Sequence, residues 1–439
     1  MNTSELIGDR IVSKVKWRIV PFAFLLYFFN GMDRVNLGYA ALTMNKALAI
    51  SSVFFGTISA AFFIAYLICQ IPSNIVLQRV GVNKLIPTIT ILWGAITSLN
   101  FFAQSGTQVA IFRFLLGVAE AGFFPGMIYY FTFWFPARER AQVTSLFFLS
   151  GPVSGLFASP ISGWIVQNAH WLGADGWRWL FVIEGLPTII LGTLAFFLLK
   201  NSPRDVKWLD NEEKNWLESE LAKEKEGKVK VQSLSFGKVI KNGTLWRLAC
   251  IYMFAQAASQ ASMFWMPGLV KGFSSSFTST TVGFLMMIPN LLGLLTMIFW
   301  GTHSDKTGER KYHTALPILI LGLSFVLIMA TNDLPIKLVA LALYGLGMWN
   351  YFGAYWTFPS KLLAPELLAV GIALINSCSS FGGFMGNYVI GFLSKATGTS
   401  GVYLYMAGLC LASFLLLVTM KITKDQPVAP GEGVENERS

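Results

Sequence analysis

Five ionisable residues stand inside long apolar runs of this sequence. Asp33 and Arg34 interrupt the run FFNGMDRVNLGYA, Arg113 and Glu120 bound the run RFLLGVAE, and Glu184 lies within FVIEGL. A charge at the centre of a hydrocarbon layer costs roughly 3 kcal/mol or more, and such charges usually mark a pair or a functional cavity. These five residues are therefore the first candidates for chemistry.

The spacing of Arg113 and Glu120 is that of a shared helix face, because seven residues make two helical turns. An arginine stays charged and can hold a carboxylate through two parallel hydrogen bonds. An enclosed carboxylic acid can take up and release a proton. The pair is therefore suited to binding an organic anion, with Arg113 as its counter-ion and Glu120 as the proton carrier.

Asp33 and Arg34 are adjacent, so their side chains point about 100° apart and need different partners. Asp33 is a second candidate for proton coupling. Arg34 is a candidate gating residue that holds Asp33 or Glu120 in its charged state. The alternative is that all four charges form fixed buried ion pairs that keep helices in register. We interpret Glu184 as a structural partner of Arg178 or of a nearby group.

Composition identifies the elements that must position these residues. The chain has 439 residues, of which 54% are hydrophobic and 13% charged, and its mean hydropathy is +0.56. Soluble domains carry about 25% charged residues, and an apolar run of about 18 residues or more can cross a membrane as a helix. The predicted crossings are 18–40, 53–77, 84–104, 107–132, 141–166, 178–199, 245–269, 280–302, 313–331, 336–359, 368–393 and 402–422.

Depth within these spans follows from the helix rise of about 1.5 Å per residue. With the first span running outward and the fourth inward, Asp33 lies roughly 9 Å from the outer edge and Arg113 roughly 5–10 Å from it. Glu120 lies about 10 Å deeper, near the midplane. The charged residues therefore occupy neighbouring depths.

The net charge of +10 reflects membrane topology. With both termini inside, about 26 of the 33 Lys and Arg fall in cytoplasmic segments. This predicts a multi-pass protein of the inner or plasma membrane with both termini cytoplasmic, and nucleic acid needs no place among its partners. The first span is too long for a signal peptide and no cleavage site follows it, so we expect it to be retained.

The longest polar segment, 200–244, divides the chain into six spans and six. The expected domains are a cytoplasmic N-terminus at 1–17, a six-helix bundle at 18–199, a cytoplasmic linker at 200–244, a second bundle at 245–422 and a disordered cytoplasmic tail at 423–439.

The linker itself contains a predicted short helix. Asp210 and Glu213 have capping-box spacing at its start. Its apolar side chains are expected to lie along the membrane surface: Trp208, Leu209, Trp216, Leu217 and Leu221.

A weak internal repeat links the two halves. GTHSDKTGERK, at 301–311, follows the eighth span, and NIVLQRVGVNK, at 74–84, follows the second. The first of these resembles the loop signature of the major facilitator superfamily, with Gly301, Asp305, Gly308, Arg310 and Lys311 in place. The 74–84 copy departs from it. The resemblance implies an all-α integral membrane fold of twelve transmembrane helices in two six-helix bundles. It also implies that Asp305 and Arg310 form a conformational latch.

Further motifs resemble the anion:cation symporter family of that superfamily: MDRVNLGYA, IPSN, RFLLGVAEAGFFPGMIYYFTFWFP, GWRWLFVIEG and ALINS. The family holds permeases for tartrate, galactonate, phthalate, nicotinate and hydroxyphenylacetate. In the galactonate type, the residues that match Asp33, Arg113, Glu120 and Tyr66 are linked to coupling and substrate binding. The resemblance also implies substrate roles for Trp356 and Asn376.

The spans that contain these residues combine aromatic and amide side chains, as a pocket with an apolar body and a few orienting groups would. Gln256 joins Tyr66, Trp356 and Asn376 as a predicted substrate-binding residue on these grounds. Packing or contact with lipid is the alternative for any one aromatic residue.

The preferred function is import of a small organic anion, such as tartrate, a sugar acid or hydroxyphenylacetate, by proton symport. An exporter or exchanger of larger compounds is the alternative, although an apolar cargo would not need Arg113. A membrane enzyme is disfavoured, because the three histidines fall at loops or span ends and no thiol–histidine or metal-binding spacing occurs. A sensor without transport is a further alternative. We expect no metal and no cofactor, and partners limited to substrate, protons and membrane lipid, with the chain a monomer.

Overall fold

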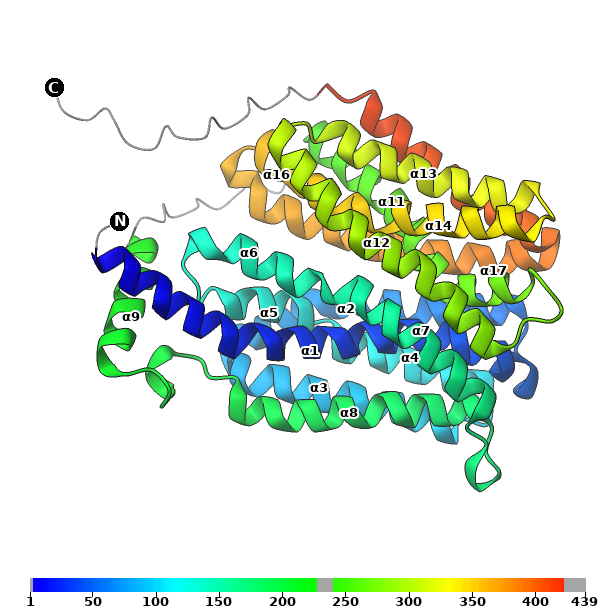
Figure 1. Ribbon diagram of the computed structural model, residues 1–439, viewed down its shortest axis with the longest axis horizontal. Coiled ribbons are helices and arrows are strands. Elements are labelled where there is room, and N and C mark those ends of the chain that lie inside the picture. The colour runs from blue at the N-terminus through cyan, green and yellow to red at the C-terminus, as the bar shows by residue number, and fades with distance from the viewer. Residues whose placement is uncertain (1–2, 227–238, 240, 422–439) are drawn as a thin grey trace.

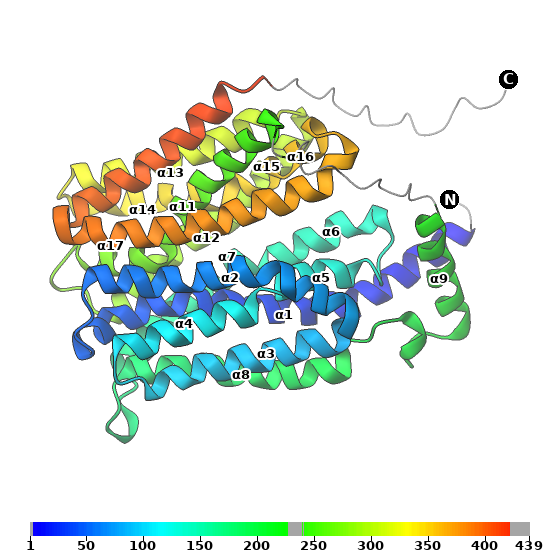
Figure 2. The same ribbon diagram turned by 180° about the vertical axis from the view of Figure 1, so that it is seen from behind.

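The structure is a computed structural model that describes residues 3–226, 239 and 241–421. Its described residues form helices, turns and loops, with no strand among them. Figure 1 and Figure 2 show two groups of helices side by side, most of them running along the longest axis of the molecule. The predicted all-α class is confirmed.

The first bundle contains α1 to α8, followed by the linker helix α9. The bounds are α1 Thr3–Ala47, α2 Ser52–Val80, α3 Val82–Leu99, α4 Gly106–Glu120, α5 Phe123–Phe131, α6 Ala137–Phe148, α7 Ser150–Asn168, α8 Gly176–Leu198 and α9 Asn211–Glu226, with short 3₁₀ turns at Asn100–Phe102 (η1), Trp171–Gly173 (η2) and Pro203–Asp205 (η3).

The second bundle contains α11 to α17. The bounds are α11 Gly243–Lys271, α12 Ser279–Thr307, α13 Lys311–Ala330, α14 Leu334–Asn350, α15 Phe352–Tyr355, α16 Thr357–Leu362 and α17 Pro365–Val418.

Length and apolar composition select eight of the described helices as able to cross a membrane. One of these, Val370–Val418, holds two crossings because the chain turns at Gly398, where φ is 65°. Three further crossings lie outside the eight. Helix α1 carries Asp33 and Arg34, α11 is rich in serine and alanine, and the crossing from α14 to α16 is interrupted twice. Together these make the twelve predicted crossings, six in each bundle.

Side-chain caps explain where several crossings begin. Ser51, Ser105, Thr278 and Asp333 each accept a hydrogen bond from a backbone N–H in the first turn of the following helix. The first four N–H groups of a helix have no partner within it, so each cap satisfies one of them. The helix starts are therefore encoded locally.

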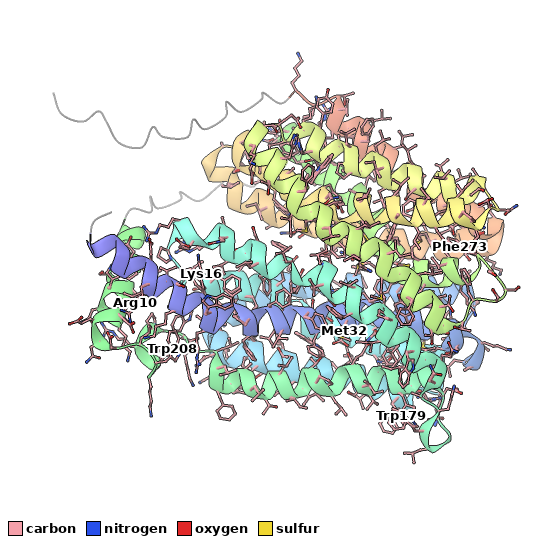
Figure 3. All side chains as sticks on the ribbon, viewed as in Figure 1. Arg10, Lys16, Met32, Trp179, Trp208 and Phe273 are labelled. Atoms are coloured by element: carbon pink, nitrogen blue, oxygen red, sulfur yellow. The ribbon has the colours of Figure 1, made fainter. Side chains whose placement is uncertain are left out.

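Figure 3 identifies the two ends of the molecule. Arg10, Lys16 and Trp208 lie toward one end, which we call the linker end because α9 is there. Trp179 and Phe273 lie toward the other, the far end. Met32, the neighbour of Asp33, lies between them. The charged part of α1 is thus positioned along the middle of the bundle.

The two bundles meet through small residues toward the far end. A Cβ added at Gly283 on α12 would lie 2.5 Å from the carbonyl oxygen of Ser159 on α7, and one added at Gly163 would lie 2.4 Å from that of Ser279. A Cβ added at Gly56 on α2 would lie 2.8 Å from the carbonyl oxygen of Asn387 on α17. Such close backbone approach is possible only with small side chains.

The linker end is more open. The half of α2 that precedes Tyr66 is mostly buried, whereas Ile68, Ile71 and Ile75 beyond it are exposed. Helix α6 packs mainly on α1, α5 and α7 of the first bundle. Helix α16 likewise packs mainly on α11, α15 and α17 of the second bundle, to which it belongs. The bundles accordingly diverge toward this end in Figure 1.

The linker helix forms as predicted, but its apolar face was assigned wrongly. Asp210 and Glu213 each accept from the other's backbone N–H, at 2.8 and 3.0 Å, which is the predicted capping box. Leu209, Leu217 and Leu221 are buried in protein and do not lie on a membrane surface.

The reason is that the start of α1 extends beyond the bundle and provides a packing surface. Trp216 packs at Gly8 of α1, Lys14 of α1 pairs with Glu213 at 2.6 Å, and Trp208 stacks on Trp134. The predicted tail at 423–439 lies outside the described residues.

Candidate functional site

The buried charges gather around one stretch of α1. Asn30, Asp33, Arg34 and Asn36 lie on successive turns, with spacings of three and four residues that bring side chains onto neighbouring faces. Arg113 and Glu120, on α4, both contact this stretch of α1. The predicted shared face of Arg113 and Glu120 is therefore the face that α4 turns toward α1.

Glu120 forms the first group, at the end of α4. Its Oε2 accepts a hydrogen bond from Asn30 Nδ2 at 2.7 Å and a longer one from Arg34 Nε at 3.4 Å. Its Oε1 is buried without a hydrogen-bond partner in the structure. Of the two partners predicted for Arg34, the structure selects Glu120.

Arg34 also lies over two aromatic rings of α2. Its guanidinium carbon is 5.3 Å from the ring centre of Phe62 and 5.5 Å from that of Tyr66. Such cation–π contacts hold a guanidinium in place while keeping its charge. The Arg34 side chain is 23% exposed, so it is the accessible guanidinium of the site, and Tyr66 lies beside it.

Arg113 forms the second group and is enclosed. It is 2% exposed, and it donates from Nη1 to the backbone carbonyl of Asp33 at 3.2 Å and from Nη2 to Asn36 Oδ1 at 2.6 Å. The ring centre of Phe181, on α8, is 5.9 Å from its guanidinium carbon. Its Nε is buried without a partner. Arg113 is thus held by α1 and α8 and is less accessible than Arg34.

Asp33 and Glu184 are two further enclosed carboxylates, 0% and 1% exposed. Asp33 Oδ1 accepts from Asn36 Nδ2 at 3.2 Å, and Glu184 Oε1 accepts from Ser162 Oγ at 2.7 Å. The other oxygen of each, Asp33 Oδ2 and Glu184 Oε2, is buried and unpartnered.

Of the two partners predicted for Glu184, Arg178 or a nearby group, the structure selects a nearby group, Ser162. Arg178 donates to the backbone carbonyls of Phe101 and Ala103, at 2.5 and 2.7 Å, and lies 4.2 Å from the ring centre of Trp177. Those carbonyls lie in and just after η1, so Arg178 fastens a loop at the far end. Glu184 lies nearly two turns further along α8, where it enters the charged cluster.

The second bundle contributes an aromatic group, whereas the first contributes the charged cluster. Tyr252 on α11 stacks on Tyr355 with ring centres 4.5 Å apart and meets Trp356 edge-on at 5.1 Å. Gln256 follows Tyr252 by one helical turn and is buried. The structure therefore brings Trp356 and Gln256 to the same aromatic group.

Asn376 is partly buried on α17, and its backbone carbonyl accepts from Ser380 Oγ at 3.2 Å. This contact lies within its own helix and joins Asn376 to neither group. The residues predicted to form one pocket are thus divided between the bundles, with Tyr66 in the first and Trp356, Gln256 and Asn376 in the second.

The signature loop between α12 and α13 forms a compact set of contacts at the linker end. Arg310 Nη1 donates to Asp305 at 2.5 Å and to Ser304 Oγ at 3.0 Å. Gly308 adopts φ 63°, a left-handed conformation in which glycine carries little strain. Lys311 Nζ donates to the carbonyl of Met420, 2.8 Å away at the end of the second bundle.

Glu309 caps the start of α13. It accepts from the backbone N–H groups of Tyr312 and His313 and contacts His313 Nδ1 at 2.8 Å, while His313 meets His303 at 2.8 Å. Burial raises the pKa of Glu309, but these donors outweigh it and leave the pKa below its ordinary value of 4.5. The carboxylate is therefore a fixed charge that orients the loop.

Sequence reasoning missed two amides, Asn30 and Asn36, and the position of Glu184 in the cluster. The amides could have been found from their spacing on α1, since both stand three residues from Asp33 and Asn30 also stands four residues from Arg34. No group of His, Cys, Asp and Glu within the described chain could hold a metal ion.

Comparison with known proteins finds relatives that are similar over nearly the whole chain. A family model described as the Major Facilitator Superfamily matches residues 23–387. An Agrobacterium vitis protein named "Putative tartrate transporter" is 39% identical over 422 residues, covering 96% of this chain and 93% of its own. This agrees with the resemblance to the anion:cation symporter family.

Two other matches are more distant. A quinolone resistance transporter of Acinetobacter baumannii is 30% identical, over 94% of this chain and 95% of its own. The structure titled as an inward open conformation of the xylose transporter from E. coli matches with a TM-score of 0.75 at 13% identity, over 92% and 96% of the two chains. At that identity the likeness concerns the fold alone.

Proposed function

The chain belongs to the major facilitator superfamily, and from this premise we propose that it imports a small organic anion, a carboxylate, by proton symport. The observation that carries the proposal is the cluster on α1, α4 and α8 of three buried carboxylates, the buried Arg113 and the partly exposed Arg34. The name of the Agrobacterium vitis relative supports a transporter of small organic anions.

Arg34 is the group that an incoming anion meets first. It is the more exposed of the two arginines, and its present partner is Glu120 at 3.4 Å, a distance that leaves room for competition. A carboxylate ligand would replace Glu120 as the acceptor, with two parallel bonds in place of one. Arg113, the counter-ion preferred from sequence, stays a candidate that becomes accessible when α1 and α4 separate.

Coupling follows from this competition. While Glu120 is charged it holds Arg34, and an anion would have to displace it. A proton on Glu120 cancels its charge, weakens the pair with Arg34 and frees the guanidinium for the substrate. Binding of the proton and binding of the anion therefore favour each other, which is the thermodynamic requirement of symport. Asp33 is the second proposed proton site.

The second bundle holds the uncharged body of the substrate. Trp356 and Gln256 flank the aromatic group around Tyr252, and Tyr66 adds a hydroxyl beside Arg34. Asn376 completes the proposed binding residues after a movement that brings α17 closer. An aromatic or hydroxylated carboxylate suits such a surface, which pairs rings with a few polar groups.

Transport proceeds by alternating access. We assign the linker end to the cytoplasm, with both termini there, so the structure is the state open to the inside. We keep the domain boundaries proposed from sequence: 1–17, 18–199, 200–244, 245–422 and 423–439. The bundles rock about the charged cluster, and Asp305 with Arg310 latches the inner end. A multi-pass carrier of this kind, placed in the inner membrane, performs no catalysis.

The deciding experiment uses purified chain in liposomes with an acidic exterior and labelled tartrate, a sugar acid and hydroxyphenylacetate. One of these should accumulate against its gradient. Glu120→Gln should abolish accumulation while substrate exchange continues, because a neutral amide mimics the protonated state permanently. Glu218→Gln, on the exposed pair with Arg204, is the matched control.

Uptake that ignores the proton gradient, or follows a sodium gradient instead, would contradict the proposal.

Export or exchange of a larger compound is the second candidate, supported by the similarity to a quinolone resistance transporter. The two are separated by direction and charge. An exporter should expel a quinolone in exchange for protons, and its export of an uncharged aromatic compound should tolerate Arg34→Ala. An anion importer should accumulate its carboxylate together with protons and should not tolerate that substitution.

A further inference from the structure

The charged cluster holds one more carboxylate than it has guanidiniums. Glu120 is paired with Arg34, which leaves Asp33 and Glu184 with Arg113 alone. Asp33, Glu184 and Arg113 are each at most 2% exposed, so solvent does not compensate the extra charge. A buried charge without a partner normally takes up or loses a proton instead.

Unpartnered atoms mark the place where this proton belongs. Asp33 Oδ2 and Glu184 Oε2 are both buried without a hydrogen-bond partner, as is Glu120 Oε1, but Glu120 has Arg34 as its counter-ion. A proton on either oxygen converts an acceptor into a donor. The inner group therefore offers two positions for one proton, one on each carboxylate.

Asn36 connects the members of this group. Its Nδ2 donates to Asp33 Oδ1 at 3.2 Å, and its Oδ1 accepts from Arg113 Nη2 at 2.6 Å. Glu184 joins this group from α8, because Phe181, three residues before it on the same helix face, lies 5.9 Å from the guanidinium carbon of Arg113. Both carboxylates are therefore within electrostatic reach of Arg113.

The groups that face Glu184 come from several helices. The charged or titratable ones are Asp33 and Tyr39 on α1 and Arg113 on α4, and Asp33 is itself also near Glu120 on α4. The α7 contact, Ser162, is neutral and does not titrate in the accessible range. Arg113 is thus the one nearby cation among the described residues that face Glu184.

We propose that Glu184 is a third proton-coupling residue, which shares one exchangeable proton with Asp33 beside Arg113. This inner pair is distinct from the Glu120–Arg34 pair, and its place in transport rests on the proposed symport. The proton comes from water and returns to water. While it is bound, the inner pair and Arg113 are together neutral, and its loss leaves a net negative charge that strengthens the hold on Arg113.

A test of the proton itself needs no substrate. Full-length chain in liposomes is cycled between acidic and alkaline buffer while the infrared difference spectrum of carboxylic-acid groups is recorded. Glu184→Gln should reduce the titrating acid signal and lower proton uptake by about one per chain. Glu220→Gln makes the same chemical change on the exposed face of α9 and should leave the signal unchanged.

Asp33→Asn keeps the test decisive if Glu184→Gln does not fold. Because the proton is shared, removing Asp33 must shift the titration of the remaining acid signal toward the behaviour of a single carboxyl beside Arg113. A wild-type titration in either folded variant overturns the proposal.

Transport is measured separately with labelled tartrate. Glu184→Gln should retain exchange and displace the pH profile of uptake, an effect that a merely structural role would not produce. If wild-type chain transports no carboxylate yet the acid signal depends on Glu184 and Asp33, the proposed function fails and the shared proton stands. If wild-type chain transports a carboxylate but neither variant changes the acid signal, the proposed function stands and the shared proton fails.

Discussion

Arg34 and Arg113 reach the same stretch of α1, but the protein encloses them differently. Arg34 rests on the rings of Phe62 and Tyr66 with part of its side chain exposed, whereas Arg113 is fastened to the backbone carbonyl of Asp33 and to Asn36. Accessibility favours Arg34 as the substrate contact, and enclosure gives Arg113 a role in holding α1.

Arg34→Lys is expected to weaken carboxylate binding by about tenfold or more, because lysine lacks the planar pair of donors. Binding would be measured by titration calorimetry on purified chain with the carboxylate that wild-type liposomes accumulate. Arg113→Lys is the comparison variant and should affect binding less in this open state. A larger loss for Arg113→Lys would reverse the assignment and restore the ranking made from sequence.

Sequence could predict which charges matter at this scale but not all of their contacts. Asp33, Arg34, Arg113 and Glu120 stood out because each interrupts an apolar run, and local spacing placed them on definite faces. The partner of Glu184 could not be predicted in that way, since Ser162 lies on another helix and is one of many neutral serines. Contacts between helices are set by packing, which periodicity does not report.

Helices and their ends were the most predictable elements. The predicted capping box of α9 is formed, and the serine caps of α2 and α4, which were not predicted, are local signals of the same kind. The break between α4 and α5 at Ala121–Gly122, directly after Glu120, was not predicted. The docking of α9 on α1 was also missed, because an apolar helix face indicates that the face is buried but does not identify the surface that buries it.

Glu309 is the element-scale residue whose charge should be measurable. Its folded pKa lies below 4.5, so its charge stabilises the fold fully above about pH 4.5, and this contribution is lost as the pH falls through the folded pKa. Glu309→Gln should therefore lower the unfolding temperature at neutral pH, and the difference from wild type should shrink on acidification. Thermal unfolding in detergent at a series of pH values would measure this, with Glu212→Gln on α9 as control.

A difference between Glu309→Gln and wild type that grows toward low pH would have the wrong sign and would exclude this account of the loop.

At the scale of the whole molecule, charge and apolar recognition are divided between the bundles. Within the described chain, the buried acids and the buried arginine belong to the first bundle. The aromatic group of Tyr252, Tyr355 and Trp356 belongs to the second. A substrate with a charged end and an uncharged body would bridge the two. Movement of one bundle against the other then changes both sets of contacts together, which ties binding to conformation.

The close contact at the far end should set the balance between conformations. A Cβ at Gly283 would lie 2.5 Å from the carbonyl oxygen of Ser159, closer than real side chains approach, so Gly283→Val should prevent α7 and α12 from meeting. A larger fraction of Gly283→Val molecules than of wild-type molecules should therefore be open at the far end. Gly408→Val is the matched control, because a Cβ there meets nothing within 4 Å.

A cysteine at Ser59 reports this shift. Ser59 is fully buried and follows Gly56 by one turn on the face of α2 that meets α17, so a water-soluble thiol reagent reaches it only when the far end opens. The four native cysteines would first be replaced by serine. Gly283→Val should increase labelling of Ser59→Cys, and Gly408→Val should not. Equal labelling in both would mean that the contact of Gly283 with Ser159 does not hold the far end closed.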